Sequence, residues 1–387
     1  MQIVQATFGV FHQFELANQL YRRGYLRKIY STWPWTRVKR EGIPHNLVGT
    51  FPYIHMPDYL LGYTAFFPNS LLAPMMKRLI AESFDSYTRM VIPECDALVA
   101  LAGAGLRTGA HVQRRGGRYV CDSGSSHHRF QHLLMQEEHK RWQFPYRPEA
   151  ESVIAHDERI YNRADAITVA SSFSARSFFE MGFPRENIHT IPYGVRLDTF
   201  HRSTPPPDIR ERFEVIFAGQ VSLRKGIPYL LEAFARVRHP HKRLRIIGAM
   251  NPAFKSVLAR LPQQSVEFLG AVPQAELARI MGESHVLVLP SVEDGFGLVM
   301  GQAMNCGCPV IASTNTGGED LFSDGEEGFT VPIRDVAALT DRMERLVQQP
   351  SLQARMSDAS MRRIATLGGW DEYGDRWESL LHTLTGR

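Results

Sequence analysis

Short apolar segments of strand length recur along this chain, and each is followed by a loop and a segment with helical periodicity. The first series begins with "IVQAT" at residues 3–7, continues through "FELANQLYRRG" to Gly24 and resumes with "LRKIYST". A strand, a helix and a second strand at this spacing predict a βαβ unit, in which the two strands run parallel. The alternation therefore predicts an α/β fold built on parallel sheets.

The alternation falls into two series, which are separated by three consecutive prolines at 205–207. The strands expected in the second series are "EVIFAGQ", "LRIIGAM", "VEFLGAV", "HVLVLPS" and "PVIASTN". At 387 residues the chain is longer than the length that one hydrophobic core usually serves. We expect two doubly wound, Rossmann-like domains facing a central cleft, over residues 1–205 and 206–366. A helix within residues 367–387 is expected to pack back on the first domain.

The composition is that of an ordinary globular protein, with 44% hydrophobic and 22% charged residues. The apolar runs are too short to span a membrane, and the N-terminus lacks the pattern of a secretory signal. The four cysteines lack metal-finger spacing and indicate buried or free thiols in a reducing compartment. We therefore expect a cytoplasmic protein.

A basic stretch that contains two tryptophans lies near the N-terminus. Its members are Arg22, Arg23, Arg27, Lys28, Arg37, Lys39 and Arg40, with Trp33 and Trp35 among them. This pattern suits peripheral contact with an anionic inner membrane surface, and a solvated helix face with tryptophans in the core explains it equally well. Residues 43 to about 93 are rich in proline, methionine and aromatic residues, which favours either a variable binding region or a lid. No partner nucleic acid is expected.

Two cations stand in the loop after the first strand of the second series, "FAGQVSLRKGIPYLLEAF". Arg224 and Lys225 precede Gly226, which opens a helix. A helix N-terminus and two cations at the edge of a parallel sheet suit a diphosphate, because amides and fixed positive charge stabilise the anion. An ordinary surface Arg-Lys pair is the alternative.

The stretch "DGFGLVMGQ" at residues 294–302 is the second candidate. Gly295 and Gly297 allow the backbone to approach a ligand, and a helix is expected from Leu298. Asp294 precedes the loop, and Gln302 lies one or two turns into the helix, so both side chains are expected to face one ligand. A tight loop that merely begins a buried helix is the alternative. Gly317 and Gly318 follow a later strand in the same way.

Taken together, "IPYGVRLDTF", "FAGQVSLRKGIPYLLEAF", "PSVEDGFGLVMGQAMNCGCPVIASTNTGGED" and "DGEEGFTVP" resemble the successive motifs of the retaining family 4 glycosyltransferases, which have the GT-B fold. The resemblance covers the chain from about Pro192 to its end. The first half resembles the family by its strand and helix rhythm more than by motif.

The resemblance implies roles for residues of the second half. Lys225 matches a lysine that contacts the donor diphosphate, whereas Gln220 stands where the family has an arginine, and Arg224 is expected to compensate. Asp294 and Gln302 replace two glutamates that bind the donor sugar and the ribose. Gln302 can still bond ribose hydroxyls at a cost of about 1 kcal/mol. The loop Gly295, Phe296, Gly297 and Leu298 completes the expected donor site.

In the first half the family places a histidine after a strand, near the reacting sugar. "YVCDSGSSHH" offers His127 for that catalytic role, beside Ser125, Ser126 and His128. A surface histidine is the alternative, since the chain has 15 histidines. Gly9 is expected to approach a donor or acceptor phosphate. His12 and Ser126 are the candidates for acceptor binding.

The resemblance implies a retaining glycosyltransferase that moves a sugar from a nucleoside diphosphate sugar to an acceptor hydroxyl. We expect Lys225, Asp294 and His127 at the reaction centre, no metal, no cofactor and a saccharide or lipid-linked acceptor. Cell-envelope or extracellular polysaccharide assembly is the expected role, with natural-product decoration as the alternative. A non-catalytic scaffold with a degenerate donor site is the main rival, and a sugar-nucleotide epimerase or phosphorylase is another.

Overall fold

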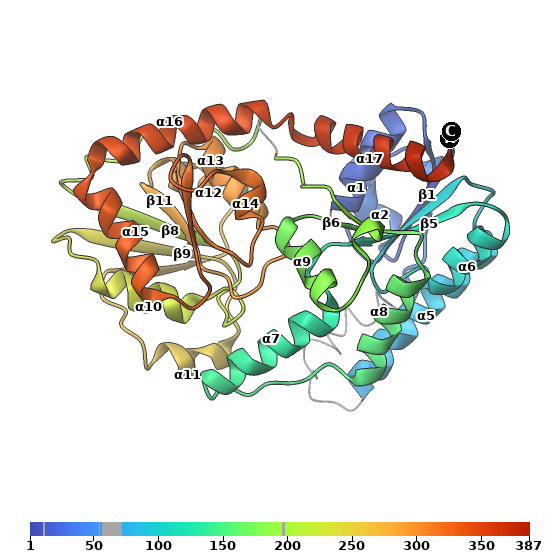
Figure 1. Cartoon of the computed structure of the whole chain (residues 1–387), viewed down its shortest axis with the longest axis horizontal. Coiled ribbons are helices and arrows are strands. Elements are labelled where there is room, and N and C mark those ends of the chain that lie inside the picture. Colours follow the sequence, from blue (N-terminus) through green and yellow to red (C-terminus); the bar gives the residue numbers. More distant parts are fainter. Residues whose placement is uncertain (11, 54, 56–71, 196–197) are drawn as a thin grey trace.

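A computed structural model gives the fold of the chain and describes all residues except 11, 54, 56–71 and 196–197. Two lobes, each with a parallel sheet, lie side by side (Figure 1). This confirms the predicted pair of doubly wound domains. Part of the proline- and methionine-rich region predicted to bind something variable falls in residues 56–71, outside the described residues.

The first lobe holds a seven-stranded sheet in the order β3-β2-β1-β4-β5-β6-β7. Its strands are β1 (Ile3–Thr7), β2 (Leu26–Ser31), β3 (Val48–Thr50), β4 (Ala97–Leu101), β5 (Arg118–Ser123), β6 (Ala166–Val169) and β7 (Ile188–Thr190). Every pairing in this sheet is parallel. Its helices are α1 (His12–Arg22), α2 (Trp35–Val38), α5 (Leu72–Val91), α6 (Leu106–Arg114), α7 (His128–Arg141), α8 (Glu151–Arg163) and α9 (Ser172–Glu180), with short 3-10 helices at Lys39–Glu41, His45–Leu47 and Arg185–Asn187.

The second lobe holds a six-stranded sheet in the order β10-β9-β8-β11-β12-β13, also parallel throughout. Its strands are β8 (Phe213–Ala218), β9 (Lys242–Ile247), β10 (Val266–Gly270), β11 (Val286–Leu289), β12 (Val310–Ser313) and β13 (Gly328–Val331). Its helices are α10 (Ile227–Arg236), α11 (Lys255–Leu258), α12 (Gln274–Gly282), α13 (Leu298–Asn305), α14 (Gly318–Leu321), α15 (Val336–Gln348) and α16 (Pro350–Thr366), with a 3-10 helix at Pro252–Phe254. The segment between β7 and β8 contains the predicted boundary at residues 205 and 206.

In both sheets the strand order reverses beside the first strand of the lobe. β1 lies between β2 and β4, and β8 lies between β9 and β11. Ligands of open α/β sheets bind outside the carboxyl ends of the strands at such reversal points. The loops after β1 and β4 in the first lobe, and after β8 and β11 in the second, therefore lie at these reversal points.

The last helix, α17 (Gly369–Thr385), returns to the first lobe and packs on α1 (Figure 1). Trp377 and Leu381 are buried in one cluster with Phe14 and Leu20 of α1. The guanidinium of Arg23 is ion-paired with Glu378 at 3.0 Å. An apolar stripe at helical spacing thus buries itself on the opposite lobe, which ties the C-terminus to the N-terminal sheet.

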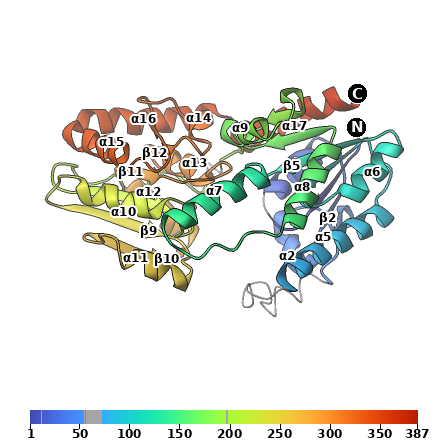
Figure 2. The ribbon, with the colours of Figure 1, turned by 60° about the horizontal axis from the view of Figure 1, so that its bottom comes forward.

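Helix α7 belongs to the first lobe but extends along the second (Figure 2). Its Glu138 is fully buried. The Glu138 carboxylate accepts a hydrogen bond from the Tyr229 hydroxyl of α10 at 2.7 Å and forms an ion pair with Arg334 at 2.7 Å. Trp142, at the end of the helix, donates to the Tyr229 hydroxyl at 3.1 Å. The two lobes are therefore joined by buried polar contacts as well as by the connecting segments.

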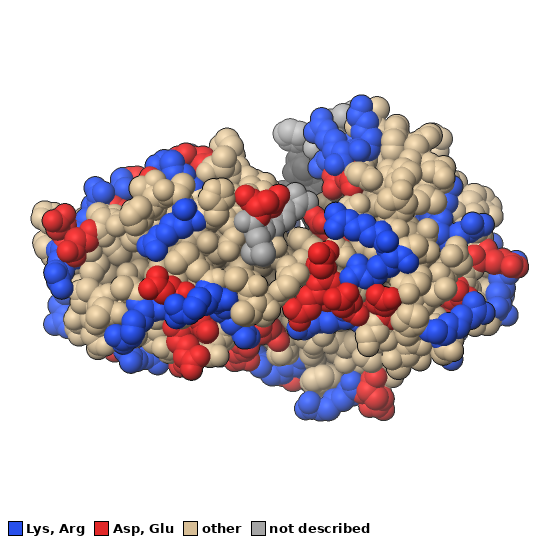
Figure 3. All heavy atoms as spheres, turned by 90° about the horizontal axis from the view of Figure 1, so that it is seen from above, with Lys and Arg blue, Asp and Glu red and all other residues tan. Residues whose placement is uncertain are grey.

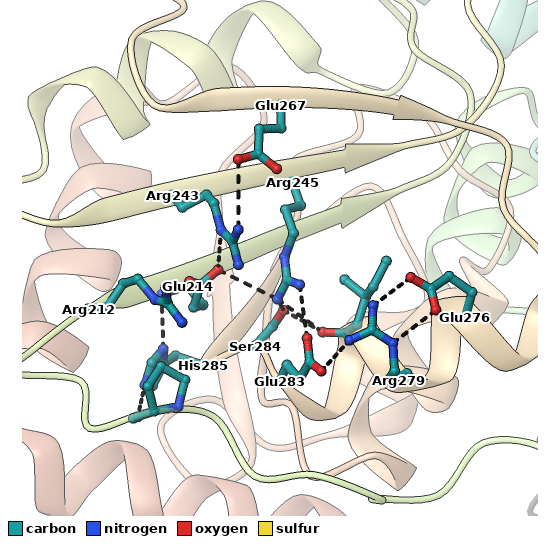
Figure 4. A network of polar contacts seen from close by, with 12 residues as sticks. Arg212, Glu214, Arg243, Arg245, Glu267, Glu276, Arg279, Glu283, Ser284 and His285 are labelled. Carbon is teal, nitrogen blue, oxygen red and sulfur yellow. Dashed lines mark hydrogen bonds and ion pairs between the residues drawn. The ribbon is translucent and has the colours of Figure 1, made fainter.

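A second buried acid, Glu214, lies near the start of β8, at the edge of the sheet opposite the carboxyl ends (Figure 4). Its carboxylate pairs with Arg243 at 2.9 Å and Arg245 at 3.5 Å, and with Arg212 at 2.6 Å. The backbone N–H of Glu214 donates to His285. Because three cations surround one carboxylate, the buried charge is compensated, and we assign this network to the stability of the sheet.

The basic N-terminal stretch is partly neutralised. Arg22 and Arg23 pair with acids of α17, Arg37 pairs with Glu41 at 3.4 Å, and Trp33 and Trp35 pack against the core of the first lobe. On the face that carries α16 and α17, Figure 3 shows lysine and arginine interspersed with aspartate and glutamate. The packing of the tryptophans agrees with the alternative that places them in the core. Among the described residues no helix is both long and apolar enough to cross a membrane.

Candidate active site

A cavity of about 870 Å³ lies between the two lobes, beside the carboxyl ends of their strands. The first lobe contributes His12, Ser125, Ser126, His128 and Gln131 to its lining, and the second contributes Leu298, Gln302 and Gln274. A second cavity of about 330 Å³ lies beside it, with Gln220 and Arg224 in its wall. His128 and Gln131 line both cavities, so they form part of the wall between the two.

The loop between β8 and α10 presents Arg224 and Lys225, and its geometry depends on Gly226. This glycine has a φ of +69°, and a Cβ added to it would come within 1.9 Å of the Pro290 carbonyl oxygen. A side chain is therefore excluded by both backbone strain and contact. The backbone carbonyl of Arg224 accepts a hydrogen bond from Val292 N at 2.9 Å, which joins this loop to the loop after β11.

Both cations of this loop are paired with acids of the neighbouring loop. The Lys225 ammonium contacts the Asp294 carboxylate, and Arg224 Nη1 lies 2.9 Å from Glu293 Oε2. Burial lowers the pKa of the Arg224 guanidinium, but the charges of Glu293 and Asp294 outweigh it and the net pKa is raised. Two cations thus stand at the carboxyl end of β8, each paired with a carboxylate of the neighbouring loop.

The stretch 294–298 lies against the first lobe. A Cβ at Gly295 would come within 2.5 Å of the Gly124 carbonyl oxygen, and the Gly295 carbonyl accepts hydrogen bonds from Ser171 at 2.6 Å and Ser174 at 3.0 Å. Gly297 caps α13 with a φ of +80°. Its neighbour Phe296 is buried. These contacts bring the N-terminus of α13 to the boundary between the lobes, where its amides can face a ligand.

The side chains predicted to bind the donor are not all in one place. Gln302 and Leu298 line the larger cavity, Gln220 and Arg224 line the smaller one, and Lys225 is nine-tenths buried against Asp294. Gly9 is buried, and its backbone N–H donates to Thr7 Oγ1 at 3.3 Å. Ser126 faces the larger cavity and donates to Glu293 Oε1 at 2.8 Å.

His12, at the start of α1, lines the larger cavity and makes polar contacts there. Its Nε2 lies 2.8 Å from Asp122 Oδ2 and 3.2 Å from the Tyr193 hydroxyl. Asp122, the penultimate residue of β5, is almost fully buried, and its carboxylate also accepts a hydrogen bond from the Thr168 hydroxyl at 3.0 Å. A histidine oriented by a buried carboxylate is a group that can hold or move a proton.

The structure places His127 away from both cavities, in a pocket of aromatic rings. Tyr161, Phe178 and Phe183 have ring centroids within 5.0 to 5.3 Å of the His127 ring. Burial lowers the pKa of His127 to about 4. The ring atom Nδ1 of His127 accepts a hydrogen bond from the backbone N–H of Arg129, so His127 is the N-cap of α7. This placement gives no support to the predicted catalytic role, because an N-cap fixes the ring toward its own helix.

Glu293 and Asp122 were not predicted as site residues. Glu293 is fully buried and bonds Ser125, Ser126, Gln131 and Arg224. Its signal in the sequence is its position directly before Asp294, in the loop after an apolar strand. Asp122 is the penultimate residue of β5. No group of three or more His, Cys, Asp or Glu side chains able to hold a metal ion occurs within the described part of the chain.

Two family models match the chain, one on each lobe. The model for glycosyltransferase family 4 matches residues 10–199, and the model for group 1 glycosyl transferases matches residues 212–349. The chain belongs to glycosyltransferase family 4. The predicted resemblance is thereby confirmed for the first half as well as for the second.

Curated relatives of this family-4 chain match it at moderate identity. A D-inositol 3-phosphate glycosyltransferase of Xylanimonas cellulosilytica is 29% identical over 58% of this chain. A GDP-mannose-dependent alpha-(1-6)-phosphatidylinositol monomannoside mannosyltransferase of Mycolicibacterium smegmatis is 28% identical over 59% of this chain. The matches span 58% and 64% of the length of these two relatives.

Solved structures of similar fold cover nearly the whole chain. Anabaena HepE in complex with UDP has a TM-score of 0.69 at 17% identity, covering 99% of this chain and 100% of that one. Sucrose-phosphate synthase of Thermosynechococcus elongatus has a TM-score of 0.69 at 19% identity, covering 100% of both chains. These likenesses confirm the GT-B fold.

Proposed function

We propose that this chain is a retaining glycosyltransferase that moves a sugar from a nucleoside diphosphate sugar to a hydroxyl of a saccharide or lipid-linked acceptor. The observation that carries the proposal is the loop after β8, where Arg224 and Lys225 stand at the strand-order reversal of the second lobe. The N-terminus of α13 and the side chain of Gln302 lie on the next loop and helix along the sheet. Cations and helix amides together suit a diphosphate.

In the proposed reaction the acceptor hydroxyl attacks the anomeric carbon from the face that the leaving group occupies, so configuration is retained. The bond from that carbon to the diphosphate oxygen breaks, and the leaving diphosphate takes the acceptor proton. Lys225, Arg224 and the amides of α13 stabilise the negative charge that develops on the leaving group. With these groups supplying the stabilisation, the proposal calls for no metal and no protein nucleophile.

We assign His12 to the acceptor side of the cavity. The Asp122 carboxylate, 2.8 Å from His12 Nε2, orients the ring, and Ser125 and Ser126 line the same cavity. An oriented imidazole can position an acceptor hydroxyl for attack. Asp294 is assigned to the donor sugar, on the condition that the sugar replaces its present contact with Lys225.

The names of related proteins support the choice of donor and acceptor classes. The Mycolicibacterium relative is GDP-mannose-dependent and is named for a phosphatidylinositol monomannoside, and the Anabaena structure holds UDP. We therefore propose assembly of a cell-envelope or extracellular polysaccharide. For such an acceptor the enzyme would work in the cytoplasm at the inner membrane face, with the exposed Arg27, Lys39 and Arg40 as its basic contacts.

A non-catalytic scaffold is the second candidate, and one observation favours it. Both cations of the diphosphate loop are already paired with carboxylates of their own lobe. If those pairs are permanent, the site cannot accept a donor, and the departures at Asp294 and Gln302 would then mark a lost activity.

Release of nucleoside diphosphate separates the two candidates. The purified chain is incubated with GDP-mannose or UDP-glucose, with and without an acceptor panel of inositol phosphate, phosphatidylinositol vesicles and simple saccharides. Release that requires an acceptor supports transfer, and the anomeric configuration of the product, read by NMR, tests retention. Lack of release under every combination would contradict the catalytic proposal and favour the scaffold.

A further inference from the structure

The carboxylate of Glu293 joins the two lobes through hydrogen bonds. It is fully buried, and Oε1 accepts hydrogen bonds from Ser125 at 3.0 Å and Ser126 at 2.8 Å. Oε2 accepts from Gln131 at 2.7 Å and from Arg224 at 2.9 Å. Three of these four donors belong to the first lobe and one to the second, so a single side chain satisfies donors from both.

This polar cluster lies where the two cavities adjoin. Gln131 and Ser125 line the larger cavity, which holds Gln302, and Arg224 lines the smaller one. A donor whose ribose bonds Gln302 and whose diphosphate bonds Arg224 has to span both cavities. Glu293 and its partners stand in the way of such a ligand.

The same cluster sets the charge available to a diphosphate. Burial raises the pKa of the Glu293 carboxyl, but the charge of Arg224 and the hydrogen bonds from Arg224, Gln131 and Ser126 outweigh it, and the net pKa is lowered. Glu293 is therefore ionised at neutral pH. A carboxylate and a phosphate are alternative anionic acceptors for one guanidinium, so the two compete for Arg224.

We propose that Glu293 is a built-in competitor of the donor diphosphate, which holds the lobes together and masks Arg224 until a diphosphate displaces it. The inference rests on the proposed function, because it assumes that a diphosphate is the natural ligand of the loop after β8. Displacement frees the Ser125 and Ser126 hydroxyls and the Gln131 amide at the same time, so donor arrival is coupled to loosening of the contact between the lobes.

The chain contains a matched control for this inference. Glu138 is also fully buried and also joins the two lobes, through Tyr229 and Arg334. Within the described residues its side-chain partners include neither Arg224 nor Lys225. A Glu138→Gln variant therefore weakens contact between the lobes without uncovering the predicted diphosphate cations.

The test is isothermal titration of the intact wild type, Glu293→Gln and Glu138→Gln with inorganic pyrophosphate and with UDP and GDP. We expect the Kd of pyrophosphate to fall by about fivefold or more in Glu293→Gln and to stay within about twofold in Glu138→Gln. Equal tightening in both variants would overturn the inference, since it would reflect general loosening. Unchanged or weaker binding in Glu293→Gln would overturn it as well.

If Glu293→Gln does not fold, amide hydrogen exchange of the wild type provides a second test of the inference. Saturating pyrophosphate is expected to speed amide exchange in residues 123–131, because their side chains lose the Glu293 carboxylate. Unchanged or slower exchange there would overturn the inference. If pyrophosphate or a nucleotide binds the wild type but neither the affinity change nor the faster exchange occurs, the inference fails and the proposed function stands. If none of these ligands binds any of the three proteins, both the proposed function and the inference are contradicted.

Discussion

The guanidinium of Arg224 lies 2.9 Å from the carboxylate of Glu293 and forms an ion pair with it. The two residues come from the loops after β8 and β11, which are neighbours in the second sheet. The backbone joins the same loops through the hydrogen bond from Val292 N to Arg224 O. At the strand-order reversal of the second lobe, the loops after β8 and β11 are thus joined by both side chains and backbone. The positions of Arg224 and Lys225 therefore depend on the loop that carries Asp294.

The turn at Gly226 provides a direct test of that dependence. Gly226→Ala is expected to lower the free energy of unfolding strongly, because the new Cβ would lie within 1.9 Å of Pro290 O. Gly270 has the same φ of +69° with no atom within 4 Å of the added Cβ, so Gly270→Ala carries only the strain of the left-handed backbone, about 1 kcal/mol. Urea denaturation measures both. Equal losses of stability in the two variants would show that the contact with Pro290 is unimportant.

Gln302 offers a test of the ribose contact. Gln302→Glu restores a charge-assisted hydrogen bond, and we expect it to tighten binding of the preferred nucleoside diphosphate by about fivefold. The exposed Gln264 supplies the control, since Gln264→Glu adds the same charge elsewhere on the second lobe. Calorimetric titration gives the affinities. If Gln302→Glu binds no better than Gln264→Glu, the assignment of Gln302 to the ribose fails.

The buried His127 predicts an acid-sensitive fold. Its pKa is lowered to about 4 by burial, whereas an unfolded histidine titrates near 6.5. Between these values the unfolded chain binds a proton that the folded chain does not, so stability is full above about pH 6.5 and falls as the pH drops toward 4. The expected loss in the free energy of unfolding between pH 7 and pH 5 is about 2 kcal/mol.

A non-titrating cap isolates this effect. His127→Asn keeps an acceptor for the N-terminus of α7 and is expected to have a lower stability at pH 7 but a flatter profile down to pH 5. His241→Asn, at an exposed histidine, should retain the slope of the wild type. Chemical denaturation at several pH values measures the three profiles. Parallel profiles for His127→Asn and wild type would refute the assignment.

The fold could be predicted because its signals are local and repeated. Each apolar strand ends in a small-residue loop, and the prolines at 205–207 lie between β7 and β8, so the two sheets could be predicted from the chain. The motifs of the second lobe predict Lys225 and Gln302 as site residues. They do not predict the ion pair of Lys225 with Asp294, because this pair depends on how two loops lie side by side.

The sequence of the first lobe carries fewer local signals of its site than that of the second. His127 and His128 are adjacent in sequence, and only the start of α7 decides that His127 turns into the aromatic pocket while His128 lines the cavities. The bond from His12 to Asp122 joins positions 110 residues apart, which no local pattern can indicate. Glu293 lay beside a recognised motif, but its role depends on serines of the opposite lobe.

The central claim is that a nucleoside diphosphate binds at the loop that carries Lys225. Its most direct test is a thermal-shift panel of UDP, GDP, dTDP and ADP against the wild type, Lys225→Ala and Lys255→Ala, the last at an exposed lysine of the same lobe. We predict that one nucleotide raises the Tm of the wild type and of Lys255→Ala, and that the shift is lost or greatly reduced in Lys225→Ala. No shift with any nucleotide at millimolar concentration, or an undiminished shift in Lys225→Ala, would contradict the account.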